Sequence, residues 1–223
     1  MAGSVNAVPS APTAAITQLL ARERLLPVVV LDDAAQALAL GAAVRAGGLS
    51  SMEVTLRTTD AEAAIRALAR EGDVVVGAGT VLTRAQAERA IDAGATFVVS
   101  PGLSSAVISY CLEIGVPVFP GVATATEIMT ALELGCRTLK FFPADVNGGT
   151  TAIKALAAPF ADVRFVPTGG IGPQVLAEYL SNPAVLAVGG SWMVARALVA
   201  SSNWAGITEL VATAAAIVAD AHA

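Results

Sequence analysis

The chain has 223 residues, of which 55% are hydrophobic and 14% charged, and its formal net charge is −5. Such a chain suits one compact domain with a large core, and this composition excludes an intrinsically disordered protein. The negative charge and the lack of basic clusters give no support to nucleic-acid binding, and no apolar run reaches the roughly 18 residues of a membrane span. The first residues carry neither a basic region nor a continuous apolar region, so we expect no secretion signal.

Three residue types are scarce enough to restrict the chemistry. The single histidine is His222, next to the C-terminus, so a histidine base, a Ser-His-Asp triad and a histidine metal site are all disfavoured. Cys111 and Cys136 lie in apolar contexts, which predicts buried thiols and a reducing, cytoplasmic location. Lys140 and Lys154 are the only lysines. A genomic preference for arginine would explain that scarcity as well as a functional constraint would.

Strand-like apolar runs alternate with helical patterns along the chain, and the connections between them are short. The expected strands are residues 26–31, 50–56, 73–79, 95–100, 116–121, 136–142, 163–170 and 184–190. The expected helices are residues 13–26, 33–47, 59–72, 83–94, 104–115, 124–135, 148–160, 172–180, 191–200 and 204–220. The strands are continuously apolar, as parallel strands buried on both faces are. The count of eight βα units and the chain length together favour a (β/α)8 TIM barrel over an open doubly wound sheet.

The start of the chain lies outside this repeat. The helix expected at residues 13–26 precedes the first strand and would cover the amino-terminal ends of the strands. We expect residues 1–13 to form a flexible N-terminal tail and residues 14–223 to form a single barrel domain. No linker or shift in composition indicates a second domain.

Polar side chains interrupt the apolar run at the end of the second expected strand. Glu53, Thr55 and Arg57 alternate along the sequence, so we expect them on one face of the strand. The carboxyl ends of barrel strands carry the chemistry in this architecture, and an acid and a base facing inwards there would form part of a site. The alternative is an ion pair at the mouth of the barrel with no role in chemistry.

Lys140 lies within the apolar run of residues 136–142. Burying an ammonium group is costly, and a desolvated lysine amine is a nucleophile. The alternative is an edge lysine whose charged end reaches water. Lys154 lies in a helical pattern, where a solvated face is the simpler explanation. Asp145, in the loop after the strand, rivals Glu53 as the working carboxylate, although a turn or helix cap explains it more simply.

Glycine pairs end the last two expected strands. Gly169 and Gly170 end the seventh strand, and Gly189 and Gly190 end the eighth, directly before Ser191. Glycine lets backbone N–H groups approach an anion closely, and the N-terminus of a following helix favours negative charge. Phosphate binding by the loops after strands 7 and 8 recurs in TIM barrels. The alternative is that both pairs only permit tight turns.

A buried lysine, an inward glutamate, an inward arginine and a phosphate-binding pair of loops form a coherent set. They indicate Schiff-base chemistry on a small phosphorylated keto acid. Three other functions would use a similar barrel. A phosphosugar isomerase or epimerase would need the phosphate loops and a carboxylate but no imine. A non-catalytic phosphometabolite-binding protein would bind without turnover. A metal-dependent pyruvate aldolase would need a cluster of ligands that the sequence does not supply.

Seven short motifs resemble one known family in their order and spacing. They are EVTLRT, GAGTVL, SPGL, KFFPA, NGG, PTGGI and GGSW, between residues 26 and 192. The family is that of 2-keto-3-deoxy-6-phosphogluconate aldolase, whose members also cleave 4-hydroxy-2-oxoglutarate. The resemblance implies a class I, metal-free aldolase without a cofactor, built as a homotrimer of (β/α)8 barrels. Its partners would be a phosphorylated 2-keto acid and pyruvate, with no nucleic acid or membrane involved.

The resemblance also implies a role for each site residue. Lys140 would be the Schiff-base lysine that attacks carbon 2 of the substrate, and Glu53 would be the general acid and base. Arg57 would hold the substrate carboxylate. The other residues with implied substrate contacts are Thr80, Pro101, Phe142, Thr168, Gly169, Gly170, Gly190 and Ser191, of which the last four would form the phosphate site. The first strand lacks the arginine that some relatives acting on the galactonate epimer carry, which favours the gluconate substrate; the galactonate epimer stays the alternative.

Overall fold

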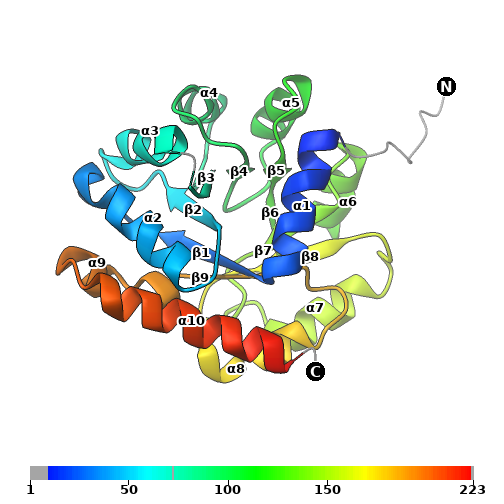
Figure 1. Cartoon of the computed structure of the whole chain (residues 1–223). Helices are drawn as coiled ribbons and strands as arrows, with labels where there is room; N and C mark the ends of the chain where they lie inside the picture. The colour runs from blue at the N-terminus through cyan, green and yellow to red at the C-terminus, as the bar shows by residue number, and fades with distance from the viewer. Residues whose placement is uncertain (1–9, 72, 222–223) are drawn as a thin grey trace.

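The computed structural model describes residues 10–71 and 73–221, so His222 and residues 1–9 of the expected tail lie outside the described residues. The chain has an α/β fold in which helices surround a curled parallel sheet (Figure 1). The strands are β1 (Leu25–Val29), β2 (Ser51–Thr55), β3 (Val75–Gly79), β4 (Val98–Val99), β5 (Val118–Phe119), β6 (Gly121–Val122), β7 (Thr138–Phe141), β8 (Arg164–Pro167) and β9 (Val188–Gly190).

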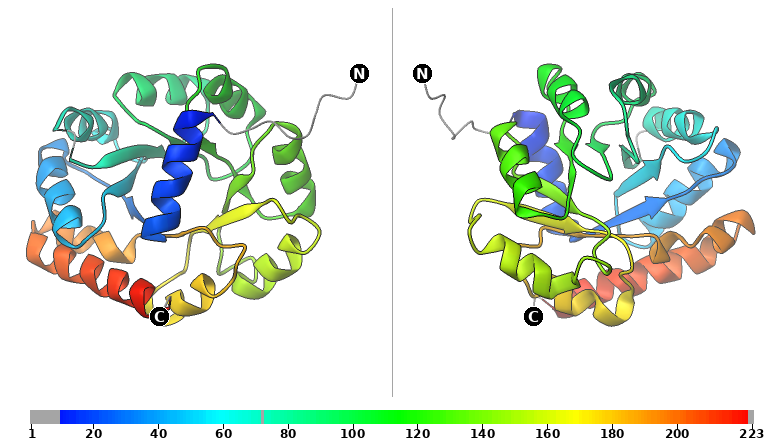
Figure 2. Two further views of the ribbon diagram at one scale, coloured as in Figure 1. Left: turned by 45° about the vertical axis from the view of Figure 1, so that its right-hand side comes forward. Right: turned by 180° about the vertical axis from the view of Figure 1, so that it is seen from behind.

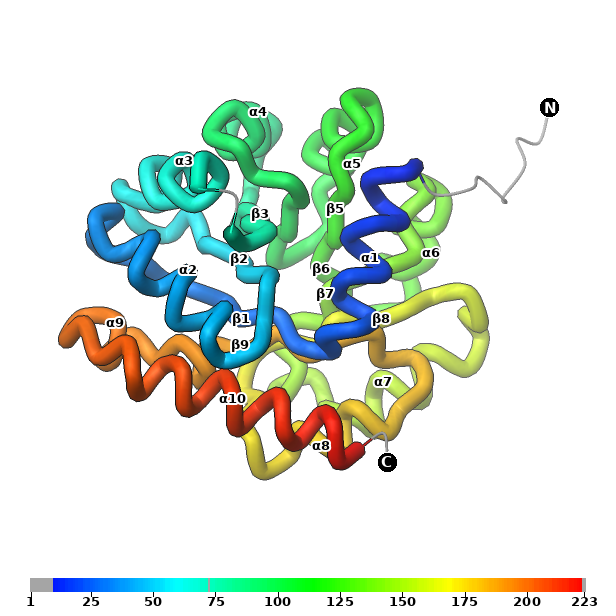
Figure 3. The backbone as a smooth tube through the Cα atoms, in the orientation of Figure 1, coloured from blue at the N-terminus to red at the C-terminus, as the bar shows by residue number. Residues whose placement is uncertain are grey.

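A helix precedes the first strand, and helices follow the later ones. The helices are α1 (Ala11–Glu23), α2 (Ala37–Ala46), α3 (Ala61–Glu71), α4 (Arg84–Asp92), α5 (Ser105–Glu113), α6 (Ala125–Glu133), α7 (Gly149–Ala157), α8 (Pro173–Leu180), α9 (Arg196–Ala200) and α10 (Trp204–Asp220), with 3-10 turns η1 (Ala34–Gln36) and η2 (Trp192–Val194). The last helix, α10, runs beside α2 and α8, as the tube in Figure 3 shows. None of the described helices is long and apolar enough to cross a membrane.

The strands pair in parallel in two groups, in the orders β5-β4-β3-β2-β1-β9 and β6-β7-β8. The strand expected at residues 116–121 is divided, because Pro120 lacks an N–H group and separates β5 from β6. The carbonyl of Pro120 still accepts a hydrogen bond from the N–H of Lys140 at 2.9 Å. Bridges between Phe165 and Val185 and between Thr168 and Gly189 link the end of the second group to the β9 side of the first.

Two apolar clusters lie on opposite sides of the curled sheet. The larger cluster lies between the strands and the helices. The smaller cluster contains Leu26, Phe97, Phe119 and Val166 from the strands and strand ends, together with Leu20 of α1. Since Leu20 is fully buried there, α1 covers the amino-terminal end of the sheet, and it crosses in front of the strands in the left view of Figure 2.

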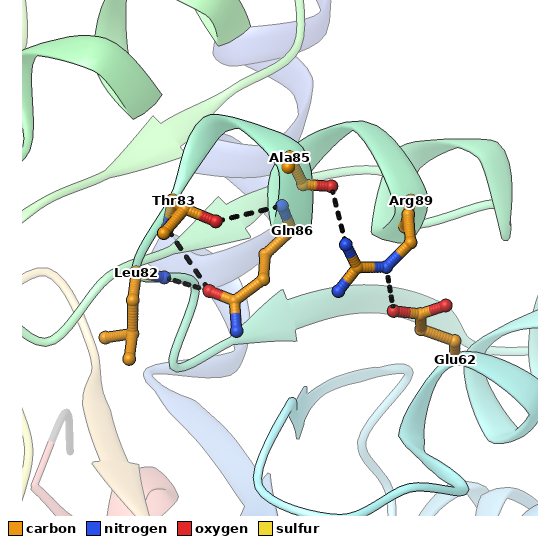
Figure 4. A network of polar contacts seen from close by, with 6 residues as sticks. All are labelled: Glu62, Leu82, Thr83, Ala85, Gln86 and Arg89. Atoms are coloured by element: carbon orange, nitrogen blue, oxygen red, sulfur yellow. Dashed lines mark hydrogen bonds and ion pairs between the residues drawn. The ribbon is translucent and has the colours of Figure 1, made fainter.

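Helix starts agree well with capping signals in the sequence. Helix α1 begins at Ala11 rather than residue 13, after Ser10, whose hydroxyl accepts a hydrogen bond from the N–H of Thr13. Helix α4 begins with a capping box between Thr83 and Gln86, drawn in Figure 4 with the ion pair between Arg89 of α4 and Glu62 of α3. These contacts hold the loop that follows β3.

The prediction of buried thiols is confirmed. Cys111 and Cys136 are both free and buried in the larger cluster. Burial raises the pKa of Cys111 to about 11 and that of Cys136 to about 12. The single helix expected at residues 191–200 is wrong in detail, because the chain forms η2 and then the short α9, separated by Ala195 in an extended conformation.

Candidate active site

Lys140 and Glu53 meet in the interior of the curled sheet. Glu53 lies on β2 and Lys140 on β7, strands that do not pair with each other. The Lys140 Nζ lies 3.2 Å from the Glu53 Oε1 and donates a hydrogen bond to it. Lys140 is 5% exposed and Glu53 is 1% exposed. The edge-lysine interpretation of Lys140 is therefore wrong, and we call these two residues the interior pair.

Strand alternation explains why these two side chains point inwards. Leu139 and Phe141 flank Lys140 and pack into the larger cluster outside the sheet. Met52 and Val54 flank Glu53 and pack into the same cluster. Since successive side chains of a strand point to opposite faces, the charged residue of each strand projects into the interior.

A glycine makes room for the carboxylate of the interior pair. A Cβ atom at Gly79, the last residue of β3, would lie 2.1 Å from the Glu53 Oε1. The Phe142 ring covers the other partner, with its centroid 5.2 Å from the Lys140 Nζ, a separation within the range of a cation–π contact. The sequence signal for Gly79 was present in the GAG motif at the strand end, but only the contact shows what the missing side chain allows.

A cavity of about 480 Å³ opens beside the interior pair. Eight residues singled out in the sequence line it: Arg57, Phe142, Thr168, Gly169, Gly170, Gly189, Gly190 and Ser191. Phe142 therefore contacts both the cavity and Lys140. A larger cavity of about 600 Å³ lies over α7 and α8 and contains Lys154, whose side chain is exposed. Lys140 and Glu53 do not themselves line the cavity of about 480 Å³, and Phe142 is the residue that connects it to the interior pair.

The two glycine pairs lie at the wall of this cavity, and each has a local reason to be glycine. Gly169 and Gly170 have φ values of +100° and +76°, which side-chain-bearing residues rarely adopt. A Cβ atom at Gly189 would lie 2.2 Å from the Thr168 Oγ1, and one at Gly190 would lie 1.6 Å from the Trp192 ring. The expectation of a helix directly after the second pair is wrong, because η2 follows it.

Arg57 lines the cavity from a turn, whereas we expected it on the inward face of β2. Strand β2 ends at Thr55, whose hydroxyl donates a hydrogen bond to the Val29 carbonyl at 2.8 Å, and Arg57 lies in the turn beyond. Its side chain is exposed and lines the cavity. Within the described part of the chain its guanidinium has no hydrogen-bond or ion-pair partner, so it is available to an anion.

Thr80 and Pro101 lie at the strand ends around the interior pair but do not line the cavity. Thr80 has a φ of 56°, uncommon for a residue with a side chain. Pro101 approaches the backbone at Gly121, where a Cβ atom would lie 2.2 Å from the Pro101 carbonyl oxygen. The contact with Gly121 holds the loop of Pro101 against β6.

Asp145 does not join the interior pair. It is exposed, and its N–H donates a hydrogen bond to the Gly169 carbonyl at 3.1 Å. Burial and then the nearby charges of Asp145 and Glu178 raise the pKa of Tyr179 on α8. The Asp145 side chain also lies against Gly170, where a Cβ atom would be 2.3 Å from the Asp145 Cβ. Sequence reasoning missed Trp192 and Arg196, which also line the cavity. Nothing in the helical pattern of residues 191–200 distinguished Arg196 from a solvated arginine.

Known proteins are similar to this chain in sequence and in architecture. The family model for KDPG and KHG aldolase matches residues 16–210. The 2-dehydro-3-deoxy-phosphogluconate aldolase of Treponema pallidum is 51% identical over 196 residues, which cover 87% of this chain and 93% of that protein.

Two solved structures are similar throughout. The 2-keto-3-deoxy-6-phosphogluconate aldolase of Zymomonas mobilis with 3-phosphoglycerate is 41% identical, with a TM-score of 0.87, and the match covers 92% of this chain and 97% of that one. The KDPG aldolase of Legionella pneumophila, with pyruvate captured as a covalent carbinolamine intermediate, is 40% identical, with a TM-score of 0.85, and the match covers 88% and 96%. The chain described here belongs to the KDPG and KHG aldolase family, and it is a carbon–carbon lyase.

Proposed function

We propose that this chain is a class I aldolase that cleaves 2-keto-3-deoxy-6-phosphogluconate to pyruvate and glyceraldehyde 3-phosphate through a Schiff base on Lys140. We also propose activity on 4-hydroxy-2-oxoglutarate. The observation that carries the proposal is the interior pair, a buried amine 3.2 Å from a buried carboxylate beside a cavity. Similarity to proteins of this name supports the choice of substrate.

The proposed reaction begins with proton transfer within the interior pair. A lysine attacks a carbonyl only as the neutral amine, and the Glu53 carboxylate is close enough to accept its proton. The Lys140 Nζ then adds to carbon 2 of the keto acid and forms a carbinolamine. Glu53 returns a proton to the departing hydroxyl, and loss of water leaves the protonated imine.

Cleavage uses the imine as an electron sink. Glu53 removes the proton of the carbon 4 hydroxyl, and the bond between carbons 3 and 4 breaks. Its electron pair moves towards the imine nitrogen, so glyceraldehyde 3-phosphate leaves and an enamine of pyruvate stays bound to Lys140. Protonation at carbon 3 and hydrolysis of the imine then release pyruvate and the free lysine.

The remaining site residues would bind the two ends of the substrate. The guanidinium of Arg57, which has no partner among the described residues, suits the keto-acid carboxylate, because its planar fork matches a carboxylate bidentately. Thr80, Pro101, Phe142 and Thr168 would surround the reacting carbons. Gly169, Gly170, Gly190 and Ser191 would contact the phosphate. The positive φ of the first glycine pair and the position of all four residues beside one cavity support this assignment.

We also propose three properties of the whole molecule. The sheet forms a closed (β/α)8 barrel within one domain of residues 14–223, and α1 is an added N-terminal helix that begins earlier, at Ala11, within the segment expected as tail. The bridges between the β8 and β9 sides support closure. The protein acts as a homotrimer, as the family resemblance implies. It works in the cytoplasm, and the two free buried cysteines favour that reducing location.

Borohydride reduction with pyruvate, followed by peptide mass spectrometry, tests the proposed chemistry. We expect a reduced pyruvyl adduct on the peptide with Lys140 and a matching loss of aldolase activity. The chain supplies its own control, since Lys154 is the only other lysine and should carry no adduct. An active protein without an adduct on Lys140 would overturn the Schiff base and favour an isomerase. If the protein turned over the galactonate epimer in preference to the gluconate substrate, only the proposed substrate would change.

A further inference from the structure

A second ion pair lies at the edge of the cavity. The Arg196 Nε donates a hydrogen bond to the Asp32 Oδ2 and the Arg196 Nη2 donates one to the Asp32 Oδ1, both at 2.8 Å. Arg196 begins α9 and lines the cavity, whereas Asp32 follows β1. We call Arg196 and Asp32 the rim pair. The two side chains are 64% and 51% exposed, so their attraction adds little to stability and a role in folding does not explain them.

The geometry of the rim pair leaves donors free. The bidentate contact uses the Nε and one N–H of the Nη2, and it fixes the plane of the guanidinium. The Nη1 group has no acceptor within the described residues. The Asp32 carboxylate raises the pKa of Arg196 mainly through these hydrogen bonds, so the guanidinium keeps its charge. A charged group with free donors and a fixed plane is arranged to bind an anion.

The charges around the cavity suit a substrate with an anion at each end. Among the described residues that line the cavity, the charged side chains are Arg57 and Arg196. Arg57 follows β2, and the proposed function assigns it to the carboxylate. Arg196 follows β9 and lies five residues beyond Ser191, on the side of the proposed phosphate loops. The second arginine is therefore suited to the second anion.

Resting on the proposed function, we propose that Arg196 is a specificity-determining residue that selects substrates with a terminal phosphate, and that Asp32 is a positioning residue that holds its guanidinium. Backbone N–H groups bind phosphate as neutral donors, whereas Arg196 adds a positive charge. Loss of the Arg196 charge would weaken phosphate binding further, because an Asp32 carboxylate without its arginine would repel the phosphate. Unphosphorylated analogues gain nothing from Arg196.

The test compares the phosphorylated substrate with 2-keto-3-deoxygluconate, which has the same carbon skeleton without the phosphate. We expect Arg196→Gln to raise KM for the phosphorylated substrate by about tenfold, as the loss of a charge-assisted hydrogen bond does. kcat for that substrate and kcat/KM for 2-keto-3-deoxygluconate should stay within about twofold of wild type. Adding Asp32→Asn to Arg196→Gln should recover part of the lost affinity, because the lone carboxylate is gone.

Arg84→Gln is the matched control. Arg84 is similarly exposed and is paired with Glu88 at 2.8 Å on α4, away from the cavity. Its loss should therefore leave the kinetic constants for both substrates unchanged. Equal losses on both substrates, or an unchanged KM for the phosphorylated one, would overturn the role of Arg196. A lack of rescue by Asp32→Asn would overturn the repulsion by the lone Asp32 carboxylate, and an unchanged KM for the phosphorylated substrate in Asp32→Asn alone would overturn the positioning role of Asp32. Failure of the proposed function is separate, because wild type itself would then turn over neither compound.

Discussion

The interior pair and the rim pair are both ion pairs, but they differ in distance and in exposure. The Lys140 Nζ and Glu53 Oε1 are 3.2 Å apart and nearly without contact with water, whereas the rim pair is bidentate at 2.8 Å and more than half exposed. Judged by distance alone, the rim pair would be the stronger ion pair. For chemistry, burial matters more than distance. Removing water makes charge on the two groups costly, and it makes proton transfer between them useful. The comparison indicates that the interior pair supplies the reaction and the rim pair supplies recognition.

Removing the amine from the interior pair should have the largest effect. We expect Lys140→Met to lower kcat/KM by at least about 10⁴-fold, because no other group can form the imine. It should also destabilise the fold by about 3–5 kcal/mol, since the Glu53 carboxylate is left buried and unpaired. Steady-state kinetics and urea unfolding measure the two effects. Lys154→Met, which changes the exposed lysine, should match wild type in both; substantial aldolase activity in Lys140→Met would refute the proposed nucleophile.

Neutralising the acid of the same pair should have the next largest effect. We expect Glu53→Gln to lower kcat by about 10²–10⁴-fold, the usual contribution of a general acid or base, with a smaller change in KM. The amide has nearly the shape of the carboxylate but cannot accept the proton. Pyruvate with borohydride should still label Lys140, only more slowly. If kcat is unchanged, another group transfers the protons and Asp145 becomes the residue to test.

Filling the space beside Glu53 should have an intermediate effect. Gly79→Ala puts a Cβ atom 2.1 Å from the Glu53 Oε1, so the carboxylate must move. A displacement of about 1 Å in a catalytic group can cost about 10²-fold in rate, and we expect a loss of that order in kcat. Gly102→Ala is the matched control, because nothing lies within 4 Å of its Cβ position and its activity should be unchanged. Equal activity in both variants would mean that Glu53 tolerates displacement.

A change in salt concentration should have the smallest of these effects, and it should distinguish the rim pair from the interior pair. Between about 0.05 and 0.5 M salt, screening of exposed charges strengthens while that of buried charges changes little. We therefore expect KM for the phosphorylated substrate to rise by about two- to fivefold and kcat to stay constant. In Arg196→Gln the rise in KM should be smaller. A strong fall of kcat with salt would contradict the separation of reaction from recognition.

Much of the fold and part of the site were predictable from local patterns. Apolar periodicity located the alternating strands and helices, and the Thr83 and Gln86 signal marked the start of α4. The apolar neighbours of Lys140 made it a candidate nucleophile, but they left an edge lysine as the alternative. Strand ends were less predictable, since Arg57 lies in a turn beyond β2 rather than on its face.

The sequence by itself determined that Glu53 and Thr55 share one face of their strand, because strand alternation acts over a few neighbouring residues. Only the tertiary structure decided which side chains meet. Glu53 and Lys140 are 87 residues apart, and Asp32 and Arg196 are 164 residues apart. Such contacts depend on how a curled sheet brings distant strand ends together, and no local period encodes that geometry. Whether a charged pair is buried or exposed to water is therefore a property of the folded chain.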